Sequence, residues 1–495
     1  MPPDANPLPT TDLIVICVYI LGIVAFGAMF AKRSRTLEGF TVGSRSLPGW
    51  AVGLSILGTF ASSIAFLANP GKSYANNWNP FVFGLSLPIA CAIAAVLFIP
   101  LYRGKLQTTA YEHLENRFGY WARAFCGISL ILLQLVRIGV VLYLVSLAMA
   151  ALLNWDIRVV IVMLGILTIF YTAVGGIEAV IWTDVVQAIV LLGGGILCCV
   201  LLLMRVPDGA GAALTSAWDQ GKFSLGDFSF NFSRDFDKNV GVFWVVLVYG
   251  IWENVRNFGV DQNYVQRFIA AKSDKEAHKS LWLGGMLFLP VSALFFLVGT
   301  LLFIYYQNGT PVGFPEKSDA IFPFFIQAEL PTGLKGLVLA ALLAAAMSTL
   351  DSSMNVSATV FVVDFYKKFR PNAEDKTLLR LTRISTIAAG VMGGAISFLC
   401  IATDAILLQW WKAAGIIGGG MVGIFLLGLW VRRASSKSAI IGTICGLAVI
   451  GWGTFTNDDS AIPFPLSSLM IGPAGTITIL LVGWISSQLF DREQA

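Results

Sequence analysis

The amino-acid sequence predicts an all-α protein that crosses a lipid bilayer many times. Hydrophobic residues make up 56% of the 495 residues and charged residues only 13%, whereas a soluble domain carries about 25% charged residues. Apolar runs of about 20 residues recur along the chain, and each can cross the hydrocarbon core as a helix. Two of these runs also contain clusters of small polar residues, which mark an ion or substrate path in many membrane proteins.

We expect about thirteen transmembrane helices in a single domain that covers residues 1–495. The helices are expected to begin near residues 11, 47, 79, 121, 157, 177, 241, 281, 334, 380, 405, 437 and 466. The N-terminal segment lacks the basic region of a cleavable signal peptide, so the first span, 11–31, should remain in the protein.

The distribution of lysine and arginine predicts an N-terminus on the outer side of the membrane. In that orientation about 22 basic residues, Arg267 among them, face the cytoplasm and about eight face the outside. An odd number of spans then places the C-terminus in the cytoplasm. Arg137, Arg256 and Lys412 fall within spans, where each charged side chain needs a partner or a functional role.

Small and polar residues predict that two spans are broken near the middle of the membrane. The second span contains Gly58-Thr59-Phe60-Ala61-Ser62-Ser63 and should stop at Pro70-Gly71, and the seventh contains the polar stretch Tyr249–Gly259. Such breaks free backbone carbonyls for ions and turn helix ends toward a substrate. The broken spans are five positions apart in the order of spans, which fits two inverted five-helix repeats, 47–204 and 241–431. An extra helix, 11–31, would precede the repeats, and two helices, 437–490, would follow them.

The remaining features limit the classes of function. The connections near 205–240 and 308–333 are long, and the apolar stretch Ala320–Ala328 predicts a short helix in the second. All seven cysteines fall within apolar spans, so disulfides are not expected. With two histidines and no HExxH, GxSxG or P-loop pattern, we expect neither catalytic residues nor enzyme activity, and no nucleic-acid partner.

A second polar cluster, Ser348-Thr349-Leu350-Asp351-Ser352-Ser353, lies in the middle of the long span that begins near 334. Its hydroxyl and carboxylate groups are hard oxygen ligands, which suit sodium and not a transition metal. A structural alternative is that the serines bond to carbonyls four residues earlier or ease helix packing. Together with the broken second span, the cluster indicates an ion-coupled transporter.

Several motifs resemble the sodium:solute symporter family along essentially the whole chain. They are Gly175-Gly176-Ile177-Glu178-Ala179-Val180-Ile181-Trp182-Thr183-Asp184-Val185-Val186-Gln187, Asp261-Gln262-Asn263-Tyr264-Val265-Gln266-Arg267-Phe268 and Ala344-Ala345-Ala346-Met347-Ser348-Thr349. Within that family, Tyr111-Glu112-His113-Leu114-Glu115-Asn116-Arg117-Phe118 followed by Arg137 is most similar to the bacterial sialic acid symporters. The resemblance implies a LeuT-type fold and transport by alternating access.

The resemblance also implies two cation sites. The main sodium site would use the backbone carbonyls of Gly58, Ala61 and Ala345 with the hydroxyls of Ser348 and Thr349. A second cation site would join Asp184, Asp351 and Ser352 to Ser348. The i, i+3, i+4 spacing of 348, 351 and 352 places these three side chains on one helix face. Asp351 departs from the sialic acid branch, which carries serine at that position.

For the solute, the resemblance implies that Arg137 binds a carboxylate, a task that suits the planar guanidinium fork. The other expected solute-binding residues surround the two breaks: Phe60, Ser62, Ser63, Asn254 and Arg256. A structural alternative pairs Arg137 with Glu253 or Asp184. The chain also departs from its relatives at Ala65 and Gly84, where they carry threonine and glutamine, and Glu253 and Arg256 could neutralise each other three residues apart.

We therefore expect a sodium-coupled symporter in the cell membrane, functional as a monomer, that imports sialic acid or a related carboxylated sugar. Its partners would be the solute, Na⁺ and the bilayer. The alternatives are a symporter for a neutral sugar, inositol or another small solute, in which Arg137 is structural, and a transporter-like membrane sensor or intramembrane enzyme. A sensor should add a soluble output domain, and an enzyme should show a nucleophile–base pair at depth.

Overall fold

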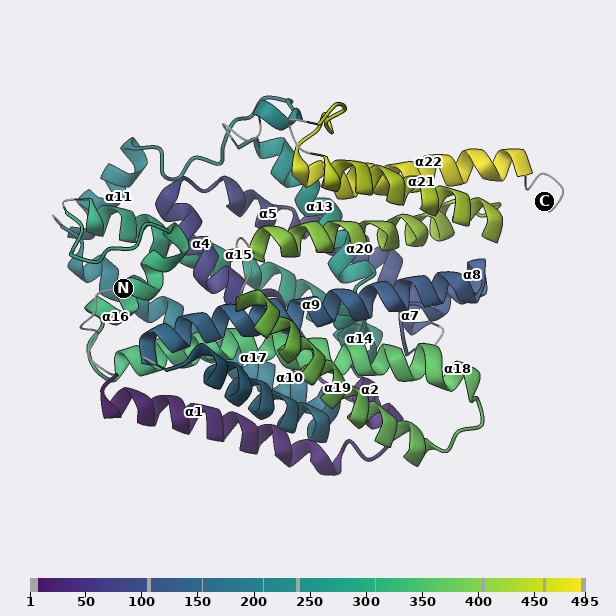
Figure 1. Ribbon diagram of the computed structural model, residues 1–495, viewed down its shortest axis with the longest axis horizontal. Helices are drawn as coiled ribbons and strands as arrows, with labels where there is room; N and C mark the ends of the chain where they lie inside the picture. The colour runs from purple at the N-terminus through teal and green to yellow at the C-terminus, as the bar shows by residue number, and fades with distance from the viewer. Residues whose placement is uncertain are drawn as a thin grey trace.

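The protein is a bundle of long helices, seen here in a computed structural model (Figure 1). The structure describes residues 8–490 apart from 105–107, 154, 208, 237–240, 308, 402–405 and 457–459. Helix α1 runs along one edge of the bundle, and α21 and α22 lie at the opposite edge (Figure 1). The principal helices are α1 (Thr10–Ala28), α3 (Gly49–Phe60), α4 (Ser63–Ala75), α9 (Tyr120–Leu153), α10 (Ile157–Arg205), α13 (Phe243–Gly259), α14 (Gln262–Ala270), α15 (Asp274–Tyr306), α17 (Leu334–Val360), α19 (Asp375–Ile401), α20 (Ile406–Trp430), α21 (Ser436–Phe455) and α22 (Ile471–Phe490).

Within the described residues, nine helices are long and apolar enough to cross a membrane, or ten if α3 and α4 are counted as one bent span. The 49-residue α10 includes a non-helical residue, Gly176, with φ 62° and ψ −160°. This glycine lies at the junction between the spans expected near 157 and 177, while α13 and α20 cover those expected near 241 and 405. The multi-pass architecture is confirmed, whereas the total of thirteen spans and the orientation of the termini stay predictions.

The break in the second span is confirmed, and its position matches the small polar cluster. Helix α3 ends at Phe60, Ala61 has non-helical φ −81° and ψ 67°, and α4 begins at Ser63. The span bends by 55° between α3 and α4. The expected stop at Pro70-Gly71 was wrong because α4 continues through Pro70 to Ala75.

The seventh span is also interrupted, but later than expected. Helix α13 runs without a break from Phe243 to Gly259, and the chain leaves helical geometry only at Val260 and Asp261. Asp261 then caps α14, because its carboxylate accepts the backbone N–H of Asn263 at 2.9 Å. The two interruptions lie side by side, since the Phe60 ring stacks on Phe258 with ring centroids 5.9 Å apart.

Helix α17 forms the centre of the bundle. It packs against α1, α3, α9, α10 and α19. In the most apolar stretch of the span that contains α17, 94% of the residues are buried, compared with 17% in the span that contains α1. An ordinary amphipathic helix shows one apolar stripe and one polar face. Because α17 is enclosed on all sides, any hydrogen-bond partner of its serines and of Asp351 must lie inside the protein.

Short elements complete the fold. They are α2 (Leu37–Val42), α5 (Val82–Leu85), α6 (Leu87–Ile93), α7 (Ile99–Arg103), α8 (Glu112–Phe118), α11 (Gly209–Asp219), α16 (Ile321–Glu329) and α18 (Lys367–Phe369). Helix α16 confirms the short helix expected over 320–328. It packs against α4, the second half of the broken span, and against α17.

Close backbone packing of α15 on α4 gives a prediction about stability. A Cβ atom on Gly299 would lie 2.2 Å from the carbonyl oxygen of Pro70, so α15 reaches α4 only because this residue is glycine. Gly299→Val should lower the free energy of unfolding by about 1–3 kcal/mol through overpacking, measured as a lower thermal midpoint in detergent. Gly394→Val in α19 is the matched control, because no heavy atom lies within 4 Å of a Cβ there. Equal shifts for the two variants would contradict this packing.

Candidate functional site

The site is built on the interruption between α3 and α4, because a helix end leaves carbonyl oxygens without partners. Two consecutive carbonyls from the last turn of α3 are used by side chains of other helices. Gly58 O accepts a hydrogen bond from the hydroxyl of Ser348 at 3.0 Å, and Thr59 O accepts one from Nη2 of Arg137 at 3.2 Å. Helices α17 and α9 thus meet the broken span at adjacent residues, and Ala61 lies at the break with 3% of its surface exposed.

Four oxygens predicted for the main sodium site come together at this point. The Ser348 hydroxyl lies 3.0 Å from Gly58 O and 3.2 Å from Ala345 O, and the Thr349 hydroxyl lies 3.2 Å from Ala345 O. The bonds to Ala345 are the local helical bonds that the structural alternative requires. The bond to Gly58 is different, because it joins two helices whose sequence positions are 290 residues apart.

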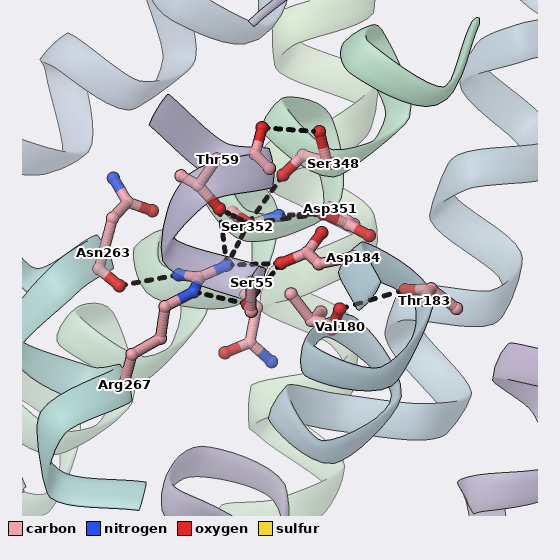
Figure 2. A network of polar contacts seen from close by, with 12 residues as sticks. Ser55, Thr59, Val180, Thr183, Asp184, Asn263, Arg267, Ser348, Asp351 and Ser352 are labelled. Atoms are coloured by element: carbon pink, nitrogen blue, oxygen red, sulfur yellow. Dashed lines mark hydrogen bonds and ion pairs between the residues drawn. The ribbon is translucent and has the colours of Figure 1, made fainter. Parts of the chain in front are cut away.

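A buried arginine dominates the space beside these oxygens (Figure 2). Arg267 of α14 is fully buried, and its Nη2 lies 2.8 Å from Oδ2 of Asp184, 2.7 Å from the Thr59 hydroxyl and 2.6 Å from the Ser352 hydroxyl. Its Nε donates to the Ser55 hydroxyl at 2.7 Å. Helices α3, α10 and α17 therefore converge on one guanidinium group.

Asp351 lies next to this network but is not bonded to the guanidinium. Its carboxylate accepts the hydroxyl of Tyr171 at 2.8 Å and the backbone N–H of Ser352 at 2.6 Å. The side chains of Asp184 and Asp351 are both fully buried. Two carboxylates and one guanidinium thus share the interior, an arrangement that is stable only where each charge is closely compensated.

The assignment of Arg267 to the cytoplasmic surface was wrong. A count of basic residues treats each arginine as exposed, whereas this side chain points into the bundle from the short helix that follows the second break. Sequence reasoning also missed Ser55 and Tyr171, which bond to Arg267 and Asp351. One signal was available: Ser55 and Thr59 are four residues apart and lie on the same face of α3.

Arg137 is left available in the interior. Its one hydrogen bond to a described residue is that to Thr59 O, and its exposure is intermediate. The expected structural partners are used elsewhere, because Glu253 pairs with Arg256 and Asp184 pairs with Arg267. Among the residues that the structure describes, no carboxylate forms an ion pair with Arg137.

Arg256, in contrast, is committed to neighbouring carboxylates. Its Nη2 and Nε lie 2.5 and 2.9 Å from the two oxygens of Glu253, and Nη1 lies 3.6 Å from Asp261. This confirms the mutual neutralisation of Glu253 and Arg256. The adjacent Asn254 is fully buried and donates to the hydroxyl of Ser86 at 2.9 Å.

Aromatic side chains from α5, α14 and α15 surround the ring of Phe60 at the break. The Phe60 ring lies 4.5 Å from the Phe288 ring, 6.0 Å from that of Tyr264 and 6.3 Å from that of Phe83, measured between centroids. Ser62 is partly exposed. The side chains of Ser63 and Lys412 lie outside the described part of the structure.

Comparisons with known proteins identify the family and the fold. The family described as "Sodium:solute symporter family" matches residues 40–446. The sodium/sialic acid symporter NanT of Aliivibrio fischeri is 32% identical over 99% of this chain and 95% of its own. A Na⁺-coupled sialic acid symporter in a substrate-bound outward-open state has a TM-score of 0.87 at 30% identity, and the match covers 97% of this chain and 98% of that one. Mhp1, a nucleobase-cation-symport-1 transporter, has a TM-score of 0.59 at 14% identity over 93% and 96% of the chains, and so shares the fold alone.

The Glu253–Arg256 pair gives a prediction that separates a structural role from solute binding. Arg256→Gln should destabilise the protein by about 3–5 kcal/mol, because it leaves buried carboxylates without their counter-charge. The double variant Glu253→Gln, Arg256→Gln should be less destabilised than the sum of the single variants, since it removes both members of the pair. Thermal unfolding of the parent protein, the two single variants and the double variant in detergent measures the coupling between the two side chains. Additive effects would show that Glu253 and Arg256 are not energetically coupled.

Proposed function

The chain belongs to the sodium:solute symporter family, and we propose that it imports sialic acid or a related carboxylated sugar together with Na⁺ by alternating access. The observation that carries this proposal is the use of adjacent carbonyls at one helix break. Gly58 O accepts a hydrogen bond from the Ser348 hydroxyl of the proposed sodium site, and Thr59 O accepts one from Arg137, the arginine proposed to bind the solute. The ion and the solute would thus act on the same turn of α3.

In the proposed sodium site, the ion binds between α3 and α17. Its ligands would be the carbonyls of Gly58, Ala61 and Ala345 and the hydroxyls of Ser348 and Thr349. The cluster of oxygens around Ser348 supports this assignment, because a small hard cation prefers several uncharged or carboxylate oxygens. On sodium binding, the Ser348 hydroxyl would exchange its bond to Gly58 O for a shared contact with the ion.

In the proposed solute site, the guanidinium of Arg137 pairs with the carboxylate of the sugar. Its lack of a carboxylate partner among the described residues supports this role, since an intramembrane arginine is retained where it has a function. Phe60 would pack on the apolar face of the sugar, while Ser62, Ser63 and Asn254 would offer hydrogen bonds. Arg256 would act on the solute only indirectly, by fixing the end of α13 through Glu253.

We propose that coupling follows from the shared break. A sodium ion would fix the carbonyls of α3 in one arrangement, and the Thr59 carbonyl would then hold Arg137 in position for the solute. The scaffold would be two inverted five-helix repeats, 47–204 and 241–431, within thirteen spans that begin outside and end in the cytoplasm. One copy of the chain would contain both sites, as a functional monomer requires.

The sodium site predicts the effect of removing its hydroxyl ligands. The double variant Ser348→Ala, Thr349→Ala should raise the sodium concentration for half-maximal uptake by at least about tenfold, or ~1.4 kcal/mol. Uptake of radiolabelled N-acetylneuraminic acid into proteoliposomes over a series of Na⁺ concentrations measures the shift. Ser357→Ala is the matched control, because that buried hydroxyl of the same helix donates only to Ser353 O. An unchanged sodium dependence in the double variant would reject the site.

The solute site predicts that Arg137 recognises the carboxylate group itself. Arg137→Gln should weaken binding of N-acetylneuraminic acid by about 2–5 kcal/mol, and Arg137→Lys should also weaken it because the planar fork is lost. The methyl ester of the same sugar, which has no free carboxylate, should bind the parent protein and Arg137→Gln equally weakly.

Calorimetric titration of purified protein measures these affinities. If a neutral sugar or inositol is the better solute and Arg137→Gln binds it normally, the carboxylate proposal fails and the neutral-solute alternative is preferred.

A further inference from the structure

Two of the residues expected to hold a second cation, Asp184 and Ser352, already contact a positive group. Asp184 Oδ2 and the Ser352 hydroxyl lie 2.8 and 2.6 Å from one nitrogen, Nη2 of Arg267, and the Thr59 hydroxyl lies 2.7 Å from it (Figure 2). A calcium-sized cation, which is about as large as Na⁺, lies about 2.3–2.6 Å from its oxygen ligands. The nitrogen therefore takes the position that a metal ion bound to these three oxygens would need.

The hydroxyl groups are also oriented as they would be around a cation. Ser55 donates its proton to Asp184 Oδ2 at 2.5 Å, and Ser352 donates to the backbone carbonyl of Ser348 at 2.7 Å. Their lone pairs are thus free to accept the N–H groups of Arg267. An arginine side chain keeps its charge at any pH that a protein meets, so this positive group is permanent.

The formal charges of the neighbouring side chains also argue against a second metal ion. Arg137 approaches Thr59 from α9, and Arg267 approaches it from α14. The two guanidinium groups and the carboxylates of Asp184 and Asp351 carry four formal charges, which sum to zero before sodium and solute bind. The total charge of these four groups therefore does not require a second metal ion.

We propose that the guanidinium of Arg267 is the resident cation of the second site, so that only one sodium ion, at the main site, is coupled to the solute. The proposal deepens the proposed function and rests on it. The charge of Arg267 would take the place of a sodium ion that binds and dissociates. Removing this charge should therefore create a second sodium site. Asp184, Ser352 and Thr59 would supply the ligands of this new site.

The experiment counts sodium ions bound to the purified full-length protein, with radiolabelled Na⁺ in equilibrium binding and without any solute. The parent protein should bind one Na⁺, and Thr349→Ala should abolish that binding. Arg267→Gln should bind two, and the added substitution Asp184→Asn should reduce the number to one. Arg267→Lys retains the charge and is the matched control, with one Na⁺ expected.

Two bound ions in the parent protein, with one lost in Asp184→Asn while Arg267 is present, would overturn the proposal. This result decides the question even if the Arg267 variants do not fold. A folded Arg267→Gln that binds one Na⁺ would also overturn it. An error in the proposed main site can be recognised separately. Sodium binding that survives Thr349→Ala would contradict the ligands proposed for that site, whereas the number of Na⁺ ions lost in Asp184→Asn would still test the second site.

Discussion

The need to satisfy the carbonyl oxygens freed where α3 ends determines the rest of this interior. Inside a bilayer no water replaces lost helical hydrogen bonds, so an interrupted helix requires partners from its neighbours. Ser348 and Arg137 supply them at Gly58 and Thr59. A break that is stabilised by a hydroxyl and a guanidinium can exchange those partners for an ion and a solute, which is the basis of the function proposed above.

The second constraint is the balance of buried charge. Asp184 lies against Arg267, Glu253 lies against Arg256, and each of these contacts is an ion pair in a largely buried setting. Breaking one member of such a pair is costly, whereas the intact pair contributes little net stability. The main role of these pairs is therefore to fix the positions of helix ends. Arg267 joins α14 to α3, α10 and α17. Arg256 joins the end of α13 to Asp261.

The sequence was sufficient to predict the multi-pass class, the break near Ala61 and the cluster of oxygens around Ser348, because each depends on residues close together in the chain. It was insufficient for the position of the second break. Polar residues between Glu253 and Asn257 suggested unwinding, but they bond to one another and to Ser86, so the helix continues to Gly259. It was also insufficient for Arg267, since only the three-dimensional packing of four helices shows that an apparent loop arginine is buried.

The central claim is that sodium binds at the α3 break and orders it. Hydrogen–deuterium exchange measured by mass spectrometry on the purified protein tests this directly, since exchange reports local opening of the backbone. Replacing potassium by sodium at constant ionic strength should slow exchange in peptides that cover the end of α3, the start of α4 and the middle of α17, and leave peptides from α21 and α22 unchanged. Identical exchange in the two salts at the α3 break, or a change spread evenly over the chain, would contradict the account.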